Sequence, residues 1–419
     1  MTRPATLSVP VDRKRRLLLH AACAAGGGLL APQAWAQRAA PLGDGRLVVV
    51  FLRGACDGLS ATVPYADPDY ARHRPTIAIP APDGSAEASI RLDRMFALHP
   101  ALAPLLPLWQ AGVLAFIPAA GSPDPTRSHF EAQNHWETGS PGRSNAPAGW
   151  LNALAGLGAG GGTAQLAIGV GEANPKILAG PAAVRLIPKG HAATREGVLA
   201  DDRTRQALLG LYAGQDAMDK AFRLGADSRL RSARELSADM TAADNGAASA
   251  AGLLLDARHL GALMRNDRGL RLGFLSAGGW DTHANQGAAS GALAKSFASL
   301  GQALVQLRRD FSGNGDLIAV ASEFGRTAAE NGTRGTDHGH GNTLWLIGNR
   351  VNGGRWHGEW SGLASGNLNE GRDLPVHHDF RSVFAQTLRA GFGLNERQLQ
   401  TVFPGAAFDA RLNDLLRTG

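Results

Sequence analysis

The chain has 419 residues, of which 44% are hydrophobic and 19% are charged, so we expect a globular protein with a large core and not a fibrous one. The net charge is +6, but residues 1–36 hold five basic residues against one acidic residue, which leaves about +2 for the rest of the chain. The basic composition therefore does not indicate nucleic-acid binding, and no basic stripe with interleaved aromatic residues appears elsewhere.

The first 36 residues are typical of a twin-arginine export signal. Arg15-Arg16 precedes two leucines and a weakly apolar stretch, and a small-residue ending suits cleavage near Ala36. The stretch is too short and too interrupted by glycine to span a bilayer stably. We therefore expect a periplasmic or secreted protein. Cys23 would leave with the signal, so Cys56 would remain alone and no internal disulfide is expected.

Short apolar runs recur along residues 37–419 and predict strands buried in a sheet. They cover residues 47–52, 112–118, 165–170, 270–279, 316–325 and 343–348. Between the third and fourth runs, about residues 201–266 are rich in Ala, Leu and Arg with helical apolar spacing, which predicts a helical insertion. This alternation is typical of one α/β domain with helices on both faces of a sheet.

Ligands of such sheets bind beyond the carboxyl ends of the strands, and polar clusters of this chain follow predicted strands. Asp57 comes just after the first strand, in the sequence GACDGLS. It is either a turn residue of the Asp57-Gly58 dipeptide or a carboxylate that reaches a site at the sheet edge. The local pattern leaves both interpretations open.

A second cluster, PDPTRSHFEAQNHWETG, follows the second strand. Ser128 and Glu131 have the spacing of a capping box at the start of a helix. Alternatively, Ser128 is a nucleophile at a helix N-terminus, where free N–H groups stabilise an anion. Arg127 and His129 flank it and could bind an acidic substrate or a metal.

A third cluster, GGWDTHANQ, follows the fourth strand. Asp281 and His283 are two residues apart, so their side chains point the same way if the backbone stays extended. A carboxylate and an imidazole suit zinc, manganese or iron, and we expect both residues to bind metal.

The densest cluster lies in SEFGRTAAENGTRGTDHGHGNT, after the fifth strand. Asp337, His338 and His340 place three candidate ligands within four residues, between glycines that permit tight turns. Glu323 is a candidate ligand at the strand end, although a carboxylate near Arg326 could also form a simple ion pair. The concentration of histidine favours a functional site.

These motifs in this order resemble a family of exported bacterial proteins of unknown function (DUF1501). The resemblance covers nearly all of residues 37–419 and extends to the alkaline phosphatase and sulfatase-like superfamily. It implies a doubly wound, mostly parallel sheet and a hydrolytic site with two metal ions. It also implies that Ser128 is the nucleophile and that Asp57, Asp281, His283, Asp337 and His338 bind the metals.

A second alignment with the superfamily places Glu323 at the later Asp and His338 at the final His. Phe324 then stands where the superfamily has a histidine ligand. In the first alignment, the final His has to be sought at His340, His377 or His378.

The function expected from the sequence is a metal-dependent hydrolase that acts on a small anionic phosphate or sulfate ester. Its cofactor would be one or two divalent ions of zinc, manganese or calcium. Ser128 would attack the ester, Arg326 would assist by holding the anion, and Glu323 and His340 would bind metal or support the ligands. The alternative is a non-catalytic exported binding or assembly protein that keeps the fold with a degenerate metal site.

Overall fold

Strand β1 (Leu47–Leu52) lies inside the main sheet, and all six of its residues are buried. It pairs in parallel with β8 (Leu272–Ala277) on one side and with β9 (Leu317–Ser322) on the other. A run of β-branched and large apolar residues suits this position, because such a strand is covered on both faces. The computed structural model describes residues 43–143, 145–159, 164–244 and 252–417, which all belong to the compact unit Pro41–Gly419. The predicted export signal and its cleavage point lie outside the described residues.

The main sheet has the strand order β11-β5-β10-β9-β1-β8-β6-β7, and β12 also pairs with β5. Only β10 runs antiparallel to its neighbours in this sheet, so the sheet is mostly parallel, as predicted. Every strand predicted from the sequence is present, whereas β7, β11 and β12 of this sheet were not predicted. The remaining strands are β5 (Leu114–Gly121), β6 (Ala167–Val170), β7 (Val184–Ile187), β10 (Asn342–Gly348), β11 (Arg355–Trp356) and β12 (His378–Asp379).

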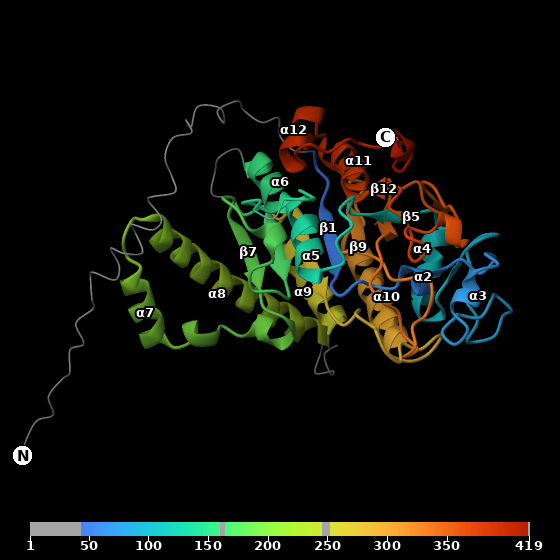
Figure 1. Cartoon of the computed structure of the whole chain (residues 1–419). Coiled ribbons are helices and arrows are strands. Elements are labelled where there is room, and N and C mark those ends of the chain that lie inside the picture. Colours follow the sequence, from blue (N-terminus) through green and yellow to red (C-terminus); the bar gives the residue numbers. More distant parts are fainter. Residues whose placement is uncertain (1–42, 144, 160–163, 245–251, 418–419) are drawn as a thin grey trace, which may run out of the picture. The chain divides into compact units, whose positions relative to one another are not determined.

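Helices pack on both faces of this sheet (Figure 1). Leu47, Val49 and Phe51 of β1 belong to one apolar core, and the alternate residues of the strand belong to the other, as the period of a strand requires. The first core includes residues of α5 (His129–Thr138), α6 (Trp150–Ala159), α11 (Phe380–Phe392) and α12 (Glu396–Val402). The second includes residues of η2 (Pro100–Leu105), α4 (Leu106–Gln110), α9 (Leu253–Asn266) and α10 (Ala292–Asp310).

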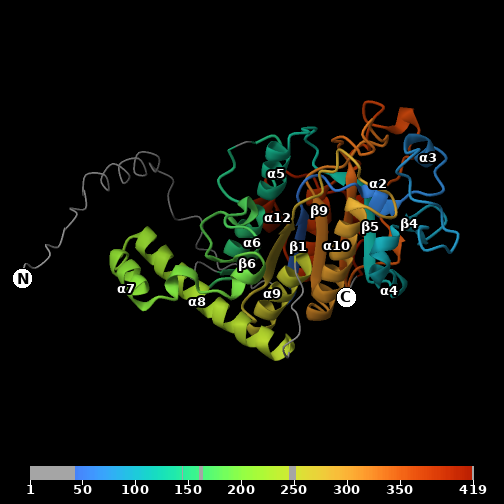
Figure 2. The ribbon, with the colours of Figure 1, turned by 90° about the horizontal axis from the view of Figure 1, so that it is seen from below.

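The predicted helical stretch at about 201–266 contains three helices with different positions. Helix α7 (Asp202–Leu211) has no buried residue, and both views show α7 farther from the sheet than α9 (Figures 1 and 2). Helix α8 (Ala217–Asp244) contacts β7 and α9. Helix α9 packs against α10 within the second core. In the described part of the chain, none of the helices is both long enough and apolar enough to cross a membrane.

A second, three-stranded sheet consists of β2 (Thr62–Val63), β4 (Ala97–Leu98) and β3 (Ile90–Arg91). The short helices complete the described elements. They are α2 (Gly58–Ala61), α3 (Tyr70–His73), η3 (Lys176–Leu178), η4 (Gly190–Thr194), η5 (Gly197–Leu199), η6 (Ser365–Asn367) and η7 (Ala410–Leu412).

The carboxyl ends of the central strands meet at one edge of the main sheet. Leu52 at the end of β1 is in register with Ala277 of β8 and Ser322 of β9. Because β10 is antiparallel, it starts at this same edge, where Asn342 pairs with Ala120 near the end of β5. The loops that follow β1, β5, β8 and β9 therefore leave from one edge, and they carry the polar clusters singled out in the sequence.

Candidate metal centre

Asp281, in the loop after β8, is the residue on which three imidazoles from two loops and one helix converge. Its Oδ1 lies 2.9 Å from Nε2 of His283 and 3.2 Å from Nε2 of His338. Its Oδ2 lies 3.3 Å from Nε2 of His129, the first residue of α5. The Nε2 atoms of His283 and His338 are themselves 3.0 Å apart. Residues from the loops after β8 and β9 and from the helix after β5 thus face one small space.

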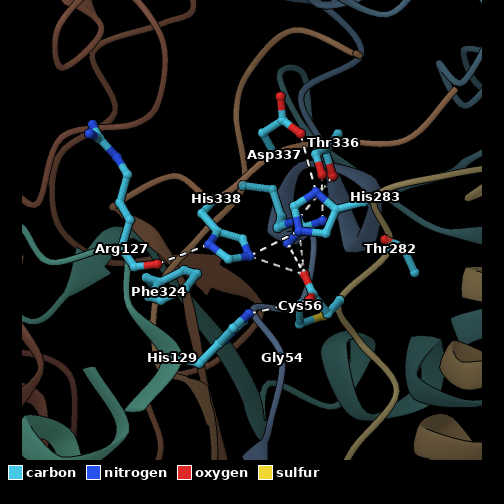
Figure 3. Close-up of polar contacts among 12 residues, drawn as sticks. Gly54, Cys56, Arg127, His129, Thr282, His283, Phe324, Thr336, Asp337 and His338 are labelled. Carbon is cyan, nitrogen blue, oxygen red and sulfur yellow. Dashed lines mark hydrogen bonds and ion pairs between the residues drawn. The ribbon is translucent and has the colours of Figure 1, made fainter. Parts of the chain in front are cut away.

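The orientation of His338 is set by the main chain. Its Nδ1 lies 2.9 Å from the carbonyl oxygen of Arg127, which can only accept a hydrogen bond. Nδ1 of His338 therefore carries a proton, and in the neutral ring Nε2 has a free lone pair. Figure 3 shows this ring between the Arg127 carbonyl and His283.

The orientation of His283 is set by a carboxylate. Its Nδ1 lies 3.2 Å from Oδ1 of Asp337. Figure 3 marks the contact between these two residues with a dashed line. A hydrogen bond from Asn331, together with the one from His283, holds the pKa of Asp337 below its usual value. Asp337 is therefore an acceptor, so His283 donates through Nδ1 and its Nε2 points to Asp281.

His129 is held in the same way by Glu323, whose side chain is buried at the end of β9. Nδ1 of His129 lies 2.9 Å from Oε1 of Glu323, which also accepts from the Gly54 N–H at 2.7 Å and from Gln133 at 3.0 Å. Burial opposes ionisation of Glu323, but the hydrogen bonds from His129 and Gln133 outweigh it and lower its pKa. The carboxylate therefore accepts from His129 and turns Nε2 of that ring toward Asp281.

Three Nε2 atoms and the Asp281 carboxylate face one another as a result, and the hydrogen bond with Glu323 raises the pKa of His129. Within the described ranges, Nε2 of His129 is buried and makes no hydrogen bond. Lone pairs gathered in this way repel each other unless protons or a cation lie between them. His129, Asp281 and His338 each offer one ligand atom, and these three atoms lie within 4.8 Å of one another. Two ligand atoms that are each about 2.1 Å from one ion can be at most about 4.2 Å apart, so a small movement would let all three atoms bind the same ion.

The donor set fits one divalent transition-metal ion. Imidazole nitrogen with one carboxylate suits zinc and also manganese or iron, whereas calcium takes oxygen ligands. Each imidazole has its other ring nitrogen bound to a carboxylate or a carbonyl, which is the arrangement that fixes metal-binding histidines. The sequence predicted one or two ions of zinc, manganese or calcium, and the arrangement favours a single ion of zinc, manganese or iron.

Phe324 gives the cluster an apolar wall. Its ring stacks on His129 at a centroid distance of 5.1 Å and lies 5.0 Å from the ring of His338. The second alignment with the superfamily treated Phe324 as the replacement of a histidine ligand. In the structure, Phe324 packs against two imidazoles and restricts their movement.

Two glycines permit the close approach of these loops. Gly54 has a positive φ of 110°, and a Cβ there would come within 2.9 Å of the Asp281 backbone nitrogen. At Gly339, between His338 and His340, a Cβ would come within 2.6 Å of the Arg326 carbonyl carbon. Side chains at either position would push the ligand loops apart.

Arg326 is buried and contacts the cluster through Asp281. Its Nη1 donates to Oδ1 of Asp281 at 2.6 Å, and its Nε donates to the Thr336 hydroxyl at 3.1 Å. The Thr336 hydroxyl donates in turn to Oε1 of Gln286 at 3.0 Å. Arg326 therefore holds Asp281 in place, and its guanidinium is not presented to solvent as an anion-binding group would be.

Asp57 lies at the far end of this hydrogen-bond chain and not among the imidazoles. Its two oxygens accept from Arg74 at 2.7 and 3.0 Å, and Oδ2 also accepts from Gln286 at 2.7 Å. Both partners of the Asp57–Arg74 pair are fully buried. Burial opposes ionisation of Asp57, but the charge of Arg74 and these hydrogen bonds outweigh it and lower the pKa of the carboxyl. The structure thus gives Asp57 other partners than the predicted metal.

Ser128 and His340 also have partners outside the cluster. Ser128 is the N-cap of α5, and its hydroxyl accepts from the Glu131 N–H at 3.5 Å. The predicted capping box is incomplete, because the Glu131 side chain accepts instead from the Thr126 hydroxyl at 2.7 Å. Nε2 of His340 lies 2.9 Å from the Ser122 carbonyl oxygen.

The predicted site residues thus separate into three groups. Asp281, His283 and His338 come together as candidate ligands. Glu323, Asp337 and Arg326 surround them and orient them, and Asp57, Ser128 and His340 lie elsewhere. His129, which the sequence marked beside Ser128 as a residue that could bind an acidic substrate or a metal, completes the cluster, and its place in the polar segment after a strand was the signal for it.

Replacing Asp57 by Asn is expected to destabilise the protein by about 3–5 kcal/mol, because it leaves the buried Arg74 charge uncompensated. Urea unfolding followed by circular dichroism measures the effect. Asp69→Asn is the matched control, because Asp69 pairs only with the exposed Arg72. Equal losses in the two variants would show that the Asp57–Arg74 pair is not a structural ion pair of this importance.

Residues 116–403 match the family described as "Protein of unknown function (DUF1501)". Comparison with curated proteins finds no match. The matched residues include every member of the imidazole cluster and both carboxylates that orient it. The chain belongs to the DUF1501 family.

Proposed function

We propose that the protein is a metal-dependent hydrolase of phosphate or sulfate esters that uses one divalent ion, held by His129, His283, His338 and Asp281. The observation that carries the proposal is the orientation of the three imidazoles. Each Nδ1 is bound by an acceptor, so each Nε2 turns toward Asp281. Imidazoles and a carboxylate gathered in this way need protons or a cation between them, and one divalent ion would bind all four groups at once.

The exposure of the cluster supports a catalytic centre more than a structural one. The side chains of His283 and Asp281 are 44% and 40% exposed, so solvent and a substrate can reach them. Structural zinc sites are usually closed by protein ligands, whereas catalytic sites keep an open position. A divalent ion there would withdraw charge from a substrate oxygen and make a water molecule a stronger acid.

An exposed arginine beside His338 supports an anionic substrate. The neighbouring Arg127 accepts from the His338 ring through its carbonyl, but its guanidinium is paired with Glu370 at 2.8 Å and with the buried Asp373 at 3.2 Å. Arg372, which is exposed, donates to the His338 carbonyl at 3.2 Å. Guanidinium groups bind phosphate and sulfate oxygens well because they present paired donors. We assign the anion-binding role to Arg372 instead of Arg326.

The proposal includes the relation to the alkaline phosphatase and sulfatase-like superfamily and the export of the protein. A mostly parallel sheet with the cluster at its carboxyl edge supports the relation to the superfamily, and Arg15-Arg16 near the N-terminus supports export.

The hydroxyl of Ser128 accepts a hydrogen bond as the N-cap of α5, so the proposed nucleophile is water. If the site binds metal without turnover, the protein is instead a non-catalytic exported binding or assembly protein.

The purified protein is expected to bind one divalent ion per chain, and His129→Ala is expected to lose it, because the substitution removes one of four ligands. Elemental analysis after dialysis against zinc or manganese measures the stoichiometry. His377→Ala is the matched control, because His377 contacts the Ser361 hydroxyl outside the cluster. Two ions per chain, or an undiminished metal content in His129→Ala, would contradict the site.

The same preparations test the reaction with p-nitrophenyl phosphate and p-nitrophenyl sulfate. Turnover that chelators abolish, that added metal restores and that Asp281→Ala lacks would support the hydrolase. Equal, negligible turnover by the metal-loaded native protein and by a folded Asp281→Ala would favour the non-catalytic alternative.

Arg372→Ala is expected to raise KM for an anionic ester by about tenfold or less, because it removes one exposed, charge-assisted contact. Metal content should stay at the native value. Arg355→Ala, at an exposed position of β11, is the matched control for loss of one positive charge. An equal KM in both variants would remove Arg372 from the substrate site.

A further inference from the structure

A cavity of about 150 Å³ lies beside the end of β8. Asp256 of α9 and Ser296 and Ser299 of α10 line it, and each lies in the N-terminal half of its helix. Ser276 at the end of β8 and Trp280 in the following loop line it from the sheet side. The cavity is therefore at the carboxyl edge of the sheet, where ligands of such folds bind.

Asp256 is a buried carboxylate with one satisfied oxygen. The residue has no exposed surface, and its Oδ1 accepts from the Gly190 N–H at 2.6 Å. In the described part of the chain, its Oδ2 is buried and has no hydrogen-bond partner. Burial raises the pKa of this carboxyl. An unpaired buried oxygen of this kind destabilises the protein, so its presence beside a cavity indicates a donor that enters from outside the chain.

The rest of the lining decides which donor fits. The hydroxyls of Ser276, Ser296 and Ser299 can each donate and accept. Lys189 also lines the cavity, and its positive charge offsets that of Asp256 and disfavours a cationic ligand. A neutral group with several hydroxyls matches this lining better than an ion of either sign.

We propose that this cavity binds a neutral, hydroxyl-rich group, a sugar or a polyol, with one of its hydroxyls donating to Oδ2 of Asp256. The site does not depend on the metal centre, because none of its polar groups belongs to the cluster around Asp281. Trp280 directly precedes Asp281, so an occupant of the cavity would lie beside the loop that carries the metal ligand.

Saturation-transfer NMR on the intact protein tests the site with three probes: D-glucose, glycerol and methylammonium. We expect saturable binding of glucose or glycerol, and the stronger of the two distinguishes a ring from an open polyol. Asp256→Asn should weaken that binding about tenfold, because a hydrogen bond to a charged acceptor is replaced by one to a neutral group. Ser299→Ala should weaken it less.

The control is Asp227→Asn, which makes the same change at an exposed position of α8 and should bind the probe as the native protein does. The metal content of Asp256→Asn should be native, which separates this test from that of the metal centre. The proposal is overturned if neither glucose nor glycerol binds saturably, if Asp256→Asn and Ser299→Ala bind the probe unchanged, or if methylammonium binds more tightly than both.

Discussion

The candidate site depends on one constraint: each imidazole donates a hydrogen bond through Nδ1 to a carbonyl or carboxylate oxygen. The Arg127 carbonyl, the Asp337 carboxylate and the Glu323 carboxylate bind the Nδ1 atoms of His338, His283 and His129, so Nε2 is the nitrogen of each ring that faces Asp281. Without these partners, the rings could rotate and exchange tautomers, and nothing would direct the three Nε2 atoms to Asp281. The three acceptor groups are therefore as necessary to the site as the ligands themselves.

The sheet makes these contacts possible. The ends of β1, β8 and β9 are in register, and the antiparallel β10 returns the long loop after β9 to the same edge. Glu323 shows the coupling most clearly, because it accepts from Gly54 after β1 and from His129 and Gln133 of α5. A shift of one strand by one residue would turn its side chains to the other face and separate these groups.

The sequence predicted what depends on local pattern. Strands buried on both faces are continuous apolar runs and were predicted. Strand β7 alternates between partly buried and buried residues, one of the buried ones is Arg185, and this strand was not predicted. The role of Asp57 could not be assigned from the neighbouring sequence, because its partner Arg74 is 17 residues away along the chain and belongs to no motif. Ser128 and His129 both begin a helix after a strand, and only the helix orientation decides that His129 faces the cluster.

A crystal of the protein soaked in zinc, with anomalous differences collected at the zinc edge, tests the central claim most directly. The account predicts one peak per chain, about 2.0–2.2 Å from Nε2 of His129, His283 and His338 and from a carboxylate oxygen of Asp281. A peak that is coordinated by Asp57, a pair of peaks bridged by Asp337, or no peak at these four residues would contradict it.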